Sequence, residues 1–238
     1  MNKRLCYLPI LFFLSLSHIT LAPAWASQDN WTEEKVSRAA IKASKAATQK
    51  KWSRAIKYGE QILRGSKALY QQNDIKFINR LNTVNSYYEK VGRCQGIAGR
   101  IQKAYDLSKK YLGQEHDTLK KSRALYYKLL ITNKEYKKAI PLVLEKISTL
   151  KISEEDNFRK RQYLGQLFSL YGLTNQRALE EQTLIKMLEL NKHLLRDAHE
   201  SNHKIILDLA KNYCLQSKIK KYNDLIKSHD LKYVCLYQ

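Results

Sequence analysis

The segment His199-Glu200-Ser201-Asn202-His203 fits the pattern H-E-x-x-H. On a helix, this spacing places two imidazoles on one face with a glutamate beside them. Zinc metalloproteases use that arrangement, in which the histidines hold the metal and the glutamate activates its water. The motif therefore raises the hypothesis of a zinc-dependent hydrolase.

The neighbours of this motif argue against a catalytic zinc site. A helix that packs into an enzyme core has mostly uncharged flanks, whereas Asp197 lies two residues before His199 and Lys204 directly follows His203. Neither of the nearby downstream acids has the context of a third ligand; they are Asp208 and Asp224. We keep the zinc hydrolase, and incidental metal binding by the two histidines, as alternatives. The main prediction is a protein without catalytic residues or a cofactor.

Other motifs for catalysis are weak or missing. His116 lies between two acids, but consecutive residues on a helix point in different directions and do not converge on one substrate atom. The glycines Gly92, Gly96 and Gly99 are spaced as at a turn between helices and do not follow a strand, so they do not form a phosphate-binding loop. The sequence therefore favours a binding protein over an enzyme.

Residues 1–26 have the pattern of a secretory signal peptide. Lys3 and Arg4 precede a short apolar stretch over residues 5–16, and Ala24-Trp25-Ala26 fits an A-x-A cleavage site. An uncleaved membrane anchor is the alternative, although the apolar stretch is short for a span of about 20 residues. We expect residues 27–238 to be exported to the periplasm or secreted.

The chain is strongly basic, with 43 Lys and Arg against 22 Asp and Glu. Loss of residues 1–26 removes Lys3 and Arg4 and no acid, which leaves a net charge of +19. This excess is spread along the chain and favours anionic partners: acidic proteins, or the lipids and polysaccharides of a cell envelope. Nucleic acid would also match the positive charge as a partner, but export of the protein argues against it. The alternative is that the charge serves solubility alone.

Three cysteines remain after position 26: Cys94, Cys214 and Cys235. Their odd number and wide spacing exclude a disulfide framework or a C-x-x-C motif. One bridge is open to them in an oxidising compartment, and Cys214 and Cys235 are the two closest in sequence.

Apolar residues recur at steps of three and four almost throughout the chain, as in Ile75, Ile78, Leu81 and Val84. This spacing is typical of amphipathic helices that each bury one stripe. We find no alternating pattern that indicates a strand, so the fold class is all-α.

The helices are predicted to form pairs, and the pairs repeat. Corresponding apolar or small positions are Ala55, Ile97, Ala139, Ala178 or a near neighbour, and Tyr222, at steps of 42, 42, 39 and 44 residues. A single pair cannot bury its own stripe, but stacked pairs bury a continuous core. We expect an α-solenoid of about five antiparallel pairs at 31–72, 74–112, 115–150, 154–195 and 198–229, with 230–238 folded back as a cap.

Polar hinges join one pair to the next. The segment from Leu112 to Thr118 reads LGQEHDT, and the segment from Leu195 to Ser201 reads LRDAHES. Acids at a helix start suit the positive end of the helix dipole. His199 and Glu200 therefore align with His116 and its neighbour, and half of the apparent zinc motif is a second copy of the hinge.

With these segments, the sequence resembles a known family. Tyr88, the turn at Gly92, and the segment from Tyr111 to Thr118 are similar to the 42-residue tetratricopeptide repeat of the kinesin light chain type. Cys94 and Ile97 depart from the tyrosine and alanine that the family prefers. The resemblance implies a right-handed superhelix whose first helices line a concave groove for peptides or proteins.

Candidate groove residues follow from position on the first helix of each pair. They are Asn82, Asn85, Lys128, Arg159, Tyr163 and Gln166. Among the 16 tyrosines we expect Tyr88, Tyr111 and Tyr136 in the core, and Tyr87, Tyr163 and one of Tyr126 and Tyr127 at the groove or in solvent. The sequence thus predicts an exported, non-catalytic scaffold that binds an acidic peptide or protein in a basic groove, with an anionic envelope lipid or polysaccharide as the second choice of ligand.

Overall fold

The structure is a computed structural model, and it describes residues 30–195, 200–231 and 235. Within these residues the chain forms ten α-helices, one short 3-10 helix and no strand. The helices are α1 (Glu33–Thr48), α2 (Trp52–Leu69), α3 (Ile75–Lys90), η1 (Gln95–Ile97), α4 (Ala98–Tyr111), α5 (Asp117–Thr132), α6 (Tyr136–Ser148), α7 (Glu154–Leu173), α8 (Arg177–Leu195), α9 (Glu200–Leu215) and α10 (Ile219–Ser228).

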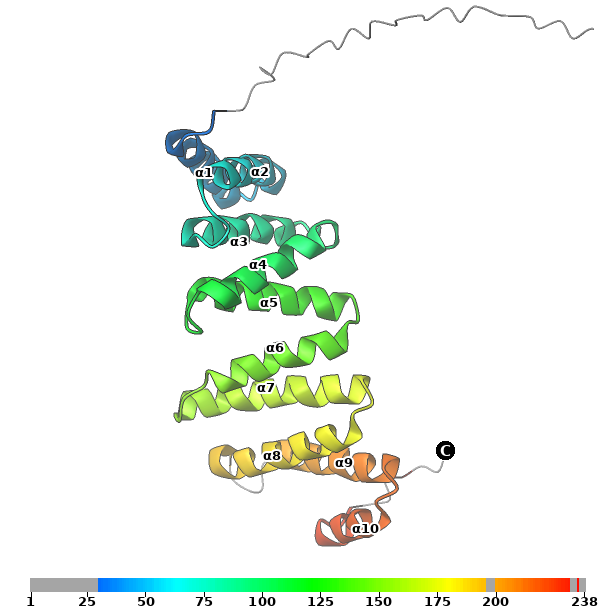
Figure 1. Cartoon of the computed structure of the whole chain (residues 1–238). Helices are drawn as coiled ribbons and strands as arrows, with labels where there is room; N and C mark the ends of the chain where they lie inside the picture. Colours follow the sequence, from blue (N-terminus) through cyan, green and yellow to red (C-terminus); the bar gives the residue numbers. More distant parts are fainter. Residues whose placement is uncertain (1–29, 196–199, 232–234, 236–238) are drawn as a thin grey trace, which may run out of the picture.

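The helices lie in five consecutive pairs that stack in chain order from α1 to α10 (Figure 1). The prediction of an all-α solenoid of about five helix pairs is confirmed. The predicted signal peptide over residues 1–26 lies outside the described residues, and so does most of the predicted cap at 230–238.

A polar residue caps the first helix of each of the first four pairs. The side chains of Thr32, Asp74, His116 and Ser153 each accept a hydrogen bond from a backbone N–H of the first turn. At His116 the acceptor is Nδ1 and the donor is the N–H of Thr118, at 3.1 Å. Such caps satisfy N–H groups that have no partner inside the helix. His116 therefore has a structural role that needs no chemistry.

The turn inside each pair is the same in all five pairs. Lys50, Gly92, Lys134, Asn175 and Ser217 all have a positive φ, between 55° and 71°. In each case the N–H of that residue bonds to the carbonyl three residues before it, and the next N–H bonds to the carbonyl five residues before itself, as in Lys134 to Ile131 and Glu135 to Leu130. This is the Schellman arrangement that ends a helix.

These turns give the repeat register. The left-handed residues are separated by 42, 42, 41 and 42 residues. Ala55, Ile97, Ala139 and Tyr222 each lie five residues after one of them. In the fourth pair that position is Glu180, two residues beyond the Ala178 expected from the sequence. Glu180 is buried, and its carboxylate accepts hydrogen bonds from Arg177 at 2.8 Å and Asn212 at 3.0 Å.

The core runs between the pairs without a break in the middle of the stack. One cluster of buried residues extends from α4 to α7 and includes Ile101, Leu119, Leu129, Val143 and Leu170. Smaller clusters lie at the α1–α2 end and at the α8–α10 end. Each pair therefore depends on its neighbours to bury its apolar stripe, as in other repeat proteins.

The positions of two tyrosines were predicted wrongly. Tyr87 was expected at the groove or in solvent, but it is only 9% exposed and lies against Gly59 of α2. Tyr111 was expected in the core, but it is 43% exposed at the end of α4. Tyr87 follows the buried Val84 by three residues, so it shares the inward stripe of α3.

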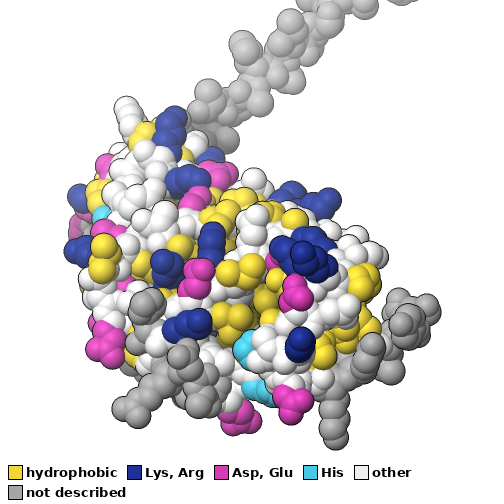
Figure 2. All heavy atoms as spheres, turned by 90° about the horizontal axis from the view of Figure 1, so that it is seen from below, with side chains coloured by type: hydrophobic (Ala, Val, Ile, Leu, Met, Phe, Trp, Pro, Cys, Tyr) yellow, Lys and Arg dark blue, Asp and Glu magenta, His cyan; other side chains and the backbone are white. Residues whose placement is uncertain are grey.

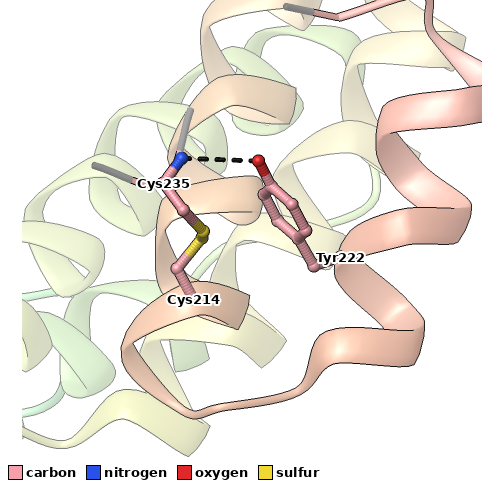
Figure 3. Close-up of a disulfide and its surroundings, with 3 residues drawn as sticks. All are labelled: Cys214, Tyr222 and Cys235. Atoms are coloured by element: carbon pink, nitrogen blue, oxygen red, sulfur yellow. Dashed lines mark hydrogen bonds between the residues drawn. A yellow bond between two sulfur atoms is a disulfide. The ribbon is translucent and has the colours of Figure 1, made fainter. Parts of the chain in front are cut away.

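A disulfide and an ionic cluster stabilise the last helix pair, α9 and α10. A disulfide joins Cys214 of α9 to Cys235, with Cα atoms 6.1 Å apart, and the Cys235 N–H donates to the Tyr222 hydroxyl of α10 at 3.3 Å (Figure 3). The two cysteines closest in sequence are thus the bonded ones, and Cys94 is free. Seen along the stack from the α10 end, apolar side chains reach the surface between charged ones (Figure 2).

The ionic cluster is centred on a buried glutamate. Glu181 of α8 is buried, and it receives hydrogen bonds from Lys218, from Lys221 at 2.8 Å and from Gln216 at 2.9 Å. Burial acts to raise the pKa of Glu181, but these hydrogen bonds outweigh it and lower the pKa to about 2. Glu181 therefore holds the α9–α10 pair as a carboxylate.

Replacing Gly92 tests the register turns. Gly92→Ala forces a side chain into the left-handed conformation and should lower the free energy of unfolding by about 1 kcal/mol, while Lys134→Gly should raise it by up to about 1 kcal/mol. Urea unfolding followed by circular dichroism measures both. Gly113→Ala is the control, because a Cβ there meets nothing within 4 Å and its φ is not positive. Equal effects of the two alanine variants would contradict the assignment.

The pH dependence of stability tests Glu181. Because its pKa is lower folded than unfolded, its contribution is complete above about pH 4.5 and is lost as the pH falls toward 2. Glu181→Gln should cost about 2–3 kcal/mol at pH 7, and this difference should shrink steadily below pH 4.5. Denaturant midpoints of both proteins across pH 3–7 would show it. A difference that stays constant with pH would refute the proposed ionic role.

Candidate functional site

Two hollows lie side by side on the first helices of neighbouring pairs. The first, here called the α3–α5 hollow, has a volume of about 690 Å³. It is lined from α3 and α5 by Asn79, Asn82, Thr83, Ser86, Glu89, Lys90, Thr118, Lys121, Ala124, Leu125 and Lys128. Three lysines face one glutamate in this set, so the hollow carries a net positive charge.

Hydrogen bonds hold two polar side chains of the α3–α5 hollow in place. The Asn82 amide donates to the Ile78 carbonyl at 3.0 Å and to the Ser108 hydroxyl at 3.1 Å. Lys128 donates to Glu89 at 2.8 Å, which raises the pKa of Lys128. Lys121 has no ion pair within the described part of the chain, so its charge is available to a ligand.

The second hollow, here called the α5–α7 hollow, has a volume of about 610 Å³. Its lining comes from α5, α6, α7 and the loops before α5 and between α6 and α7: Glu115, Lys120, Arg123, Ala124, Lys146, Thr149, Leu150, Lys151, Asp156, Arg159 and Tyr163. Five basic residues face two acids. Ala124 lines both hollows, so they adjoin across α5 at a small side chain. We call the two together the α3–α7 groove.

A buried ionic network supports the α5–α7 hollow. Glu145 of α6 accepts hydrogen bonds from Lys109 and from the Tyr105 hydroxyl at 2.7 Å, and its carboxylate lies 3.2 Å from Nε of the buried Arg123. Burial acts to raise the pKa of Glu145, but these donors and charges outweigh it, so the pKa lies below its ordinary value. Arg123 also donates to Gln114 at 3.0 Å. The guanidinium is therefore fixed at the wall of the hollow.

The six residues proposed from the sequence separate into three groups. Asn82 and Lys128 line the α3–α5 hollow, and Arg159 and Tyr163 line the α5–α7 hollow. Asn85 and Gln166 line neither. Asn85 is fully buried and accepts from Arg100 Nε at 2.8 Å, so it joins α3 to α4 and does not face a ligand. The binding role of the four groove residues stays a prediction.

Sequence reasoning missed the residues that give the groove much of its charge. Arg123 lies on the apolar stripe of α5, where an arginine is unexpected, and Lys146 comes from a second helix, a class that the sequence-based choice left out. Arg123 could have been found from the sequence, because a charged residue on a buried stripe requires a partner or a function.

The H-E-x-x-H motif falls at the start of α9. Glu200 begins this helix and is exposed, and His203 and Lys204 are also exposed. His199 lies outside the described residues. Within residues 30–195, 200–231 and 235, no three His, Cys, Asp or Glu side chains gather as metal ligands would.

Comparison with known proteins places the fold. No protein-family model and no curated protein matches the sequence. Among solved structures, the chain is similar to the nearly identical TPR-like repeats of a kinesin light chain-like protein from Podosopora anserina, with a TM-score of 0.55 and 15% identity over 82% of this chain and 94% of that one. The chain has a tetratricopeptide-like repeat fold.

A second solved structure is less similar. MamA from Desulfovibrio magneticus RS-1, from residue 41 to its end, superposes with a TM-score of 0.49 and 14% identity over 82% of this chain and 93% of that one. The similarity to the kinesin light chain-like repeats, at a TM-score of 0.55, confirms the family resemblance inferred from the sequence at the level of the fold. In the tetratricopeptide-like arrangement, α3, α5 and α7 are the first helices of their pairs, which is where the groove lies.

None of the described helices combines the length and apolarity needed to cross a membrane.

Removing the Glu145 carboxylate tests the support of the groove. Glu145→Gln leaves Arg123 buried without its counter-charge and should lower the free energy of unfolding by about 3 kcal/mol. Chemical denaturation at pH 7 measures this cost. Glu135→Gln is the matched control, because its partner Lys138 is exposed and an exposed pair contributes little to stability. If both variants cost the same, the Glu145 network does not anchor the hollow.

Proposed function

We propose that this tetratricopeptide-like protein is a non-catalytic scaffold that binds an acidic peptide or protein segment in the α3–α7 groove. A repeat fold of this kind serves protein interaction, and the groove is a recess formed mainly between first helices. The observation that carries the proposal is the charge of the two hollows, where eight basic residues face three acids.

The local partners of these charges support binding of an anion. Glu115 pairs with Lys120, Glu89 with Lys128 and Asp156 with Arg159, so all three acids of the groove are already engaged. Lys90, Lys121 and Lys151 line the groove without an ion pair in the described structure. An acidic segment supplies the charges that the groove lacks, and electrostatic complementarity of this type increases association rate and specificity.

Export is part of the proposal. The leader pattern of residues 1–26 supports it, and so does the Cys214–Cys235 disulfide, because structural disulfides persist in oxidising compartments such as the periplasm or outside the cell. In that setting the partner is an envelope or secreted protein with an acidic segment.

Capture of partners at two salt concentrations tests this function. The immobilised protein should retain a discrete acidic protein from solubilised envelopes at about 50 mM salt and much less at about 300 mM, because salt screens the attraction. Lys121→Glu should reduce capture at least about tenfold, since it places a like charge in the groove.

The control is Lys103→Glu, which makes the same change of charge at an exposed position of α4 outside the groove. It should bind like the unmodified protein. Equal capture by both variants would overturn the groove as the binding surface. Binding of anionic lipid vesicles without any protein partner would favour the envelope surface as the ligand.

A further inference from the structure

Lys146 occupies an unusual position in the α5–α7 hollow. Its ammonium lies 4.9 Å from the ring centre of Tyr127 on α5 and 5.3 Å from that of Tyr163 on α7. The side chain is half-buried, and among the described residues no carboxylate pairs with it. A lysine normally keeps its charged end in water or pairs it, because removing the charge from water is costly.

Arg123 adds a second cation beside this lysine. It is 2% exposed and lines the same hollow. Burial lowers the pKa of Lys146, and the nearby charge of Arg123 lowers it further. A bound anion beside Lys146 and Arg123 would offset both effects.

The available negative charge does not compensate this pair. Glu145 is shared by Lys109 and Arg123, so one carboxylate serves two cations before Lys146 is considered. Arg159 is engaged by Glu155 and Asp156 on its own helix. The hollow therefore holds fixed positive charge between two aromatic rings and contains too few anions to balance it.

We propose that the α5–α7 hollow is an oxyanion-binding site, in which Lys146 and Arg123 bind a side-chain carboxylate of the acidic segment. This inference rests on the proposed function and specifies where the segment is held. Contacts of the ammonium with the rings of Tyr127 and Tyr163 restrict the Lys146 side chain, so little side-chain entropy is lost when the anion binds. Hydrogen bonds from charged donors to a carboxylate are the strong ones in proteins.

A carboxylate of a peptide fits the hollow better than a lipid phosphate. Among the described residues that line it, Leu150 and Ala124 are the aliphatic ones, and two such side chains offer little aliphatic surface to an acyl chain. The neighbouring α3–α5 hollow continues the path for an extended chain. Packed helices lie about 8–10 Å apart and an extended chain advances about 3.3–3.6 Å per residue. Acidic residues about three positions apart therefore reach both hollows.

Binding of labelled peptides to the purified full chain tests this site. The probe is an extended peptide with glutamates at positions i and i+3, and the comparison is a peptide of equal composition with adjacent glutamates. We expect tighter binding of the first peptide. Lys146→Met keeps the apolar stem between the rings and should weaken that binding about tenfold. Lys137→Met, on the exposed face of the same α6, should leave it unchanged.

The outcomes separate this site from the proposed function. If the spaced peptide binds Lys146→Met and Lys137→Met equally but loses affinity in Lys121→Glu, the acidic-segment function stands and this site is wrong. If neither peptide binds the unmodified chain, both the acidic-segment function and this site are wrong. If phosphatidylglycerol vesicles bind and lose affinity in Lys146→Met while the peptides do not bind, the carboxylate ligand is wrong. Selective loss of peptide binding in Lys146→Met, with its melting temperature within a few degrees of the unmodified protein, supports the site.

Discussion

The reversal of the chain within each helix pair is the constraint on which the rest of the molecule depends. Five residues of four different types adopt the same left-handed conformation and the same two backbone hydrogen bonds. Because the turn is made by the backbone, it tolerates Lys, Asn and Ser where glycine is the usual choice. Its near-constant spacing keeps successive first helices in register. The α3–α7 groove exists because that register brings α3, α5 and α7 to one surface.

Aromatic rings and carboxylates share the task of accommodating the basic residues on this framework. Lys or Arg groups lie over the rings of Tyr58, Tyr70, Tyr88, Tyr105, Tyr111, Tyr127, Tyr163 and Tyr213. Such contacts contribute about 0.5–1 kcal/mol each where they are exposed. Arg80, Arg100, Lys109 and Lys221 also pair with a carboxylate. At Lys42, Lys76, Lys110 and Lys146 the ring is a favourable neighbour that leaves the positive charge uncancelled. The abundance of tyrosine and the net charge of the chain are therefore two aspects of one solution.

Much of the fold could be predicted from the sequence, because helical periodicity and a 42-residue repeat are local signals. The caps at His116 and Ser153 could also be expected from hydroxyl, imidazole and acidic residues next to an apolar stripe. The fourth register could not, since Glu180 occupies a position that is apolar in the other four pairs. The groove was predicted only in part. Arg123 and Lys146 belong to it through contacts between separate helices, and no spacing along one helix reveals such contacts.

The disulfide at the α10 end makes the two ends of the stack unequal in their resistance to unfolding. In a linear array each pair contacts only its neighbours, so unfolding starts most easily at an end, where a pair has one neighbour instead of two. At the α10 end, the covalent bond from Cys214 to Cys235 encloses α10 and keeps its residues close to α9 even when their packing loosens. The α1 end has no such bond among the described residues. Opening of the stack therefore proceeds from α1 toward α10, and the molecule resists a pulling force or a protease differently at its two ends.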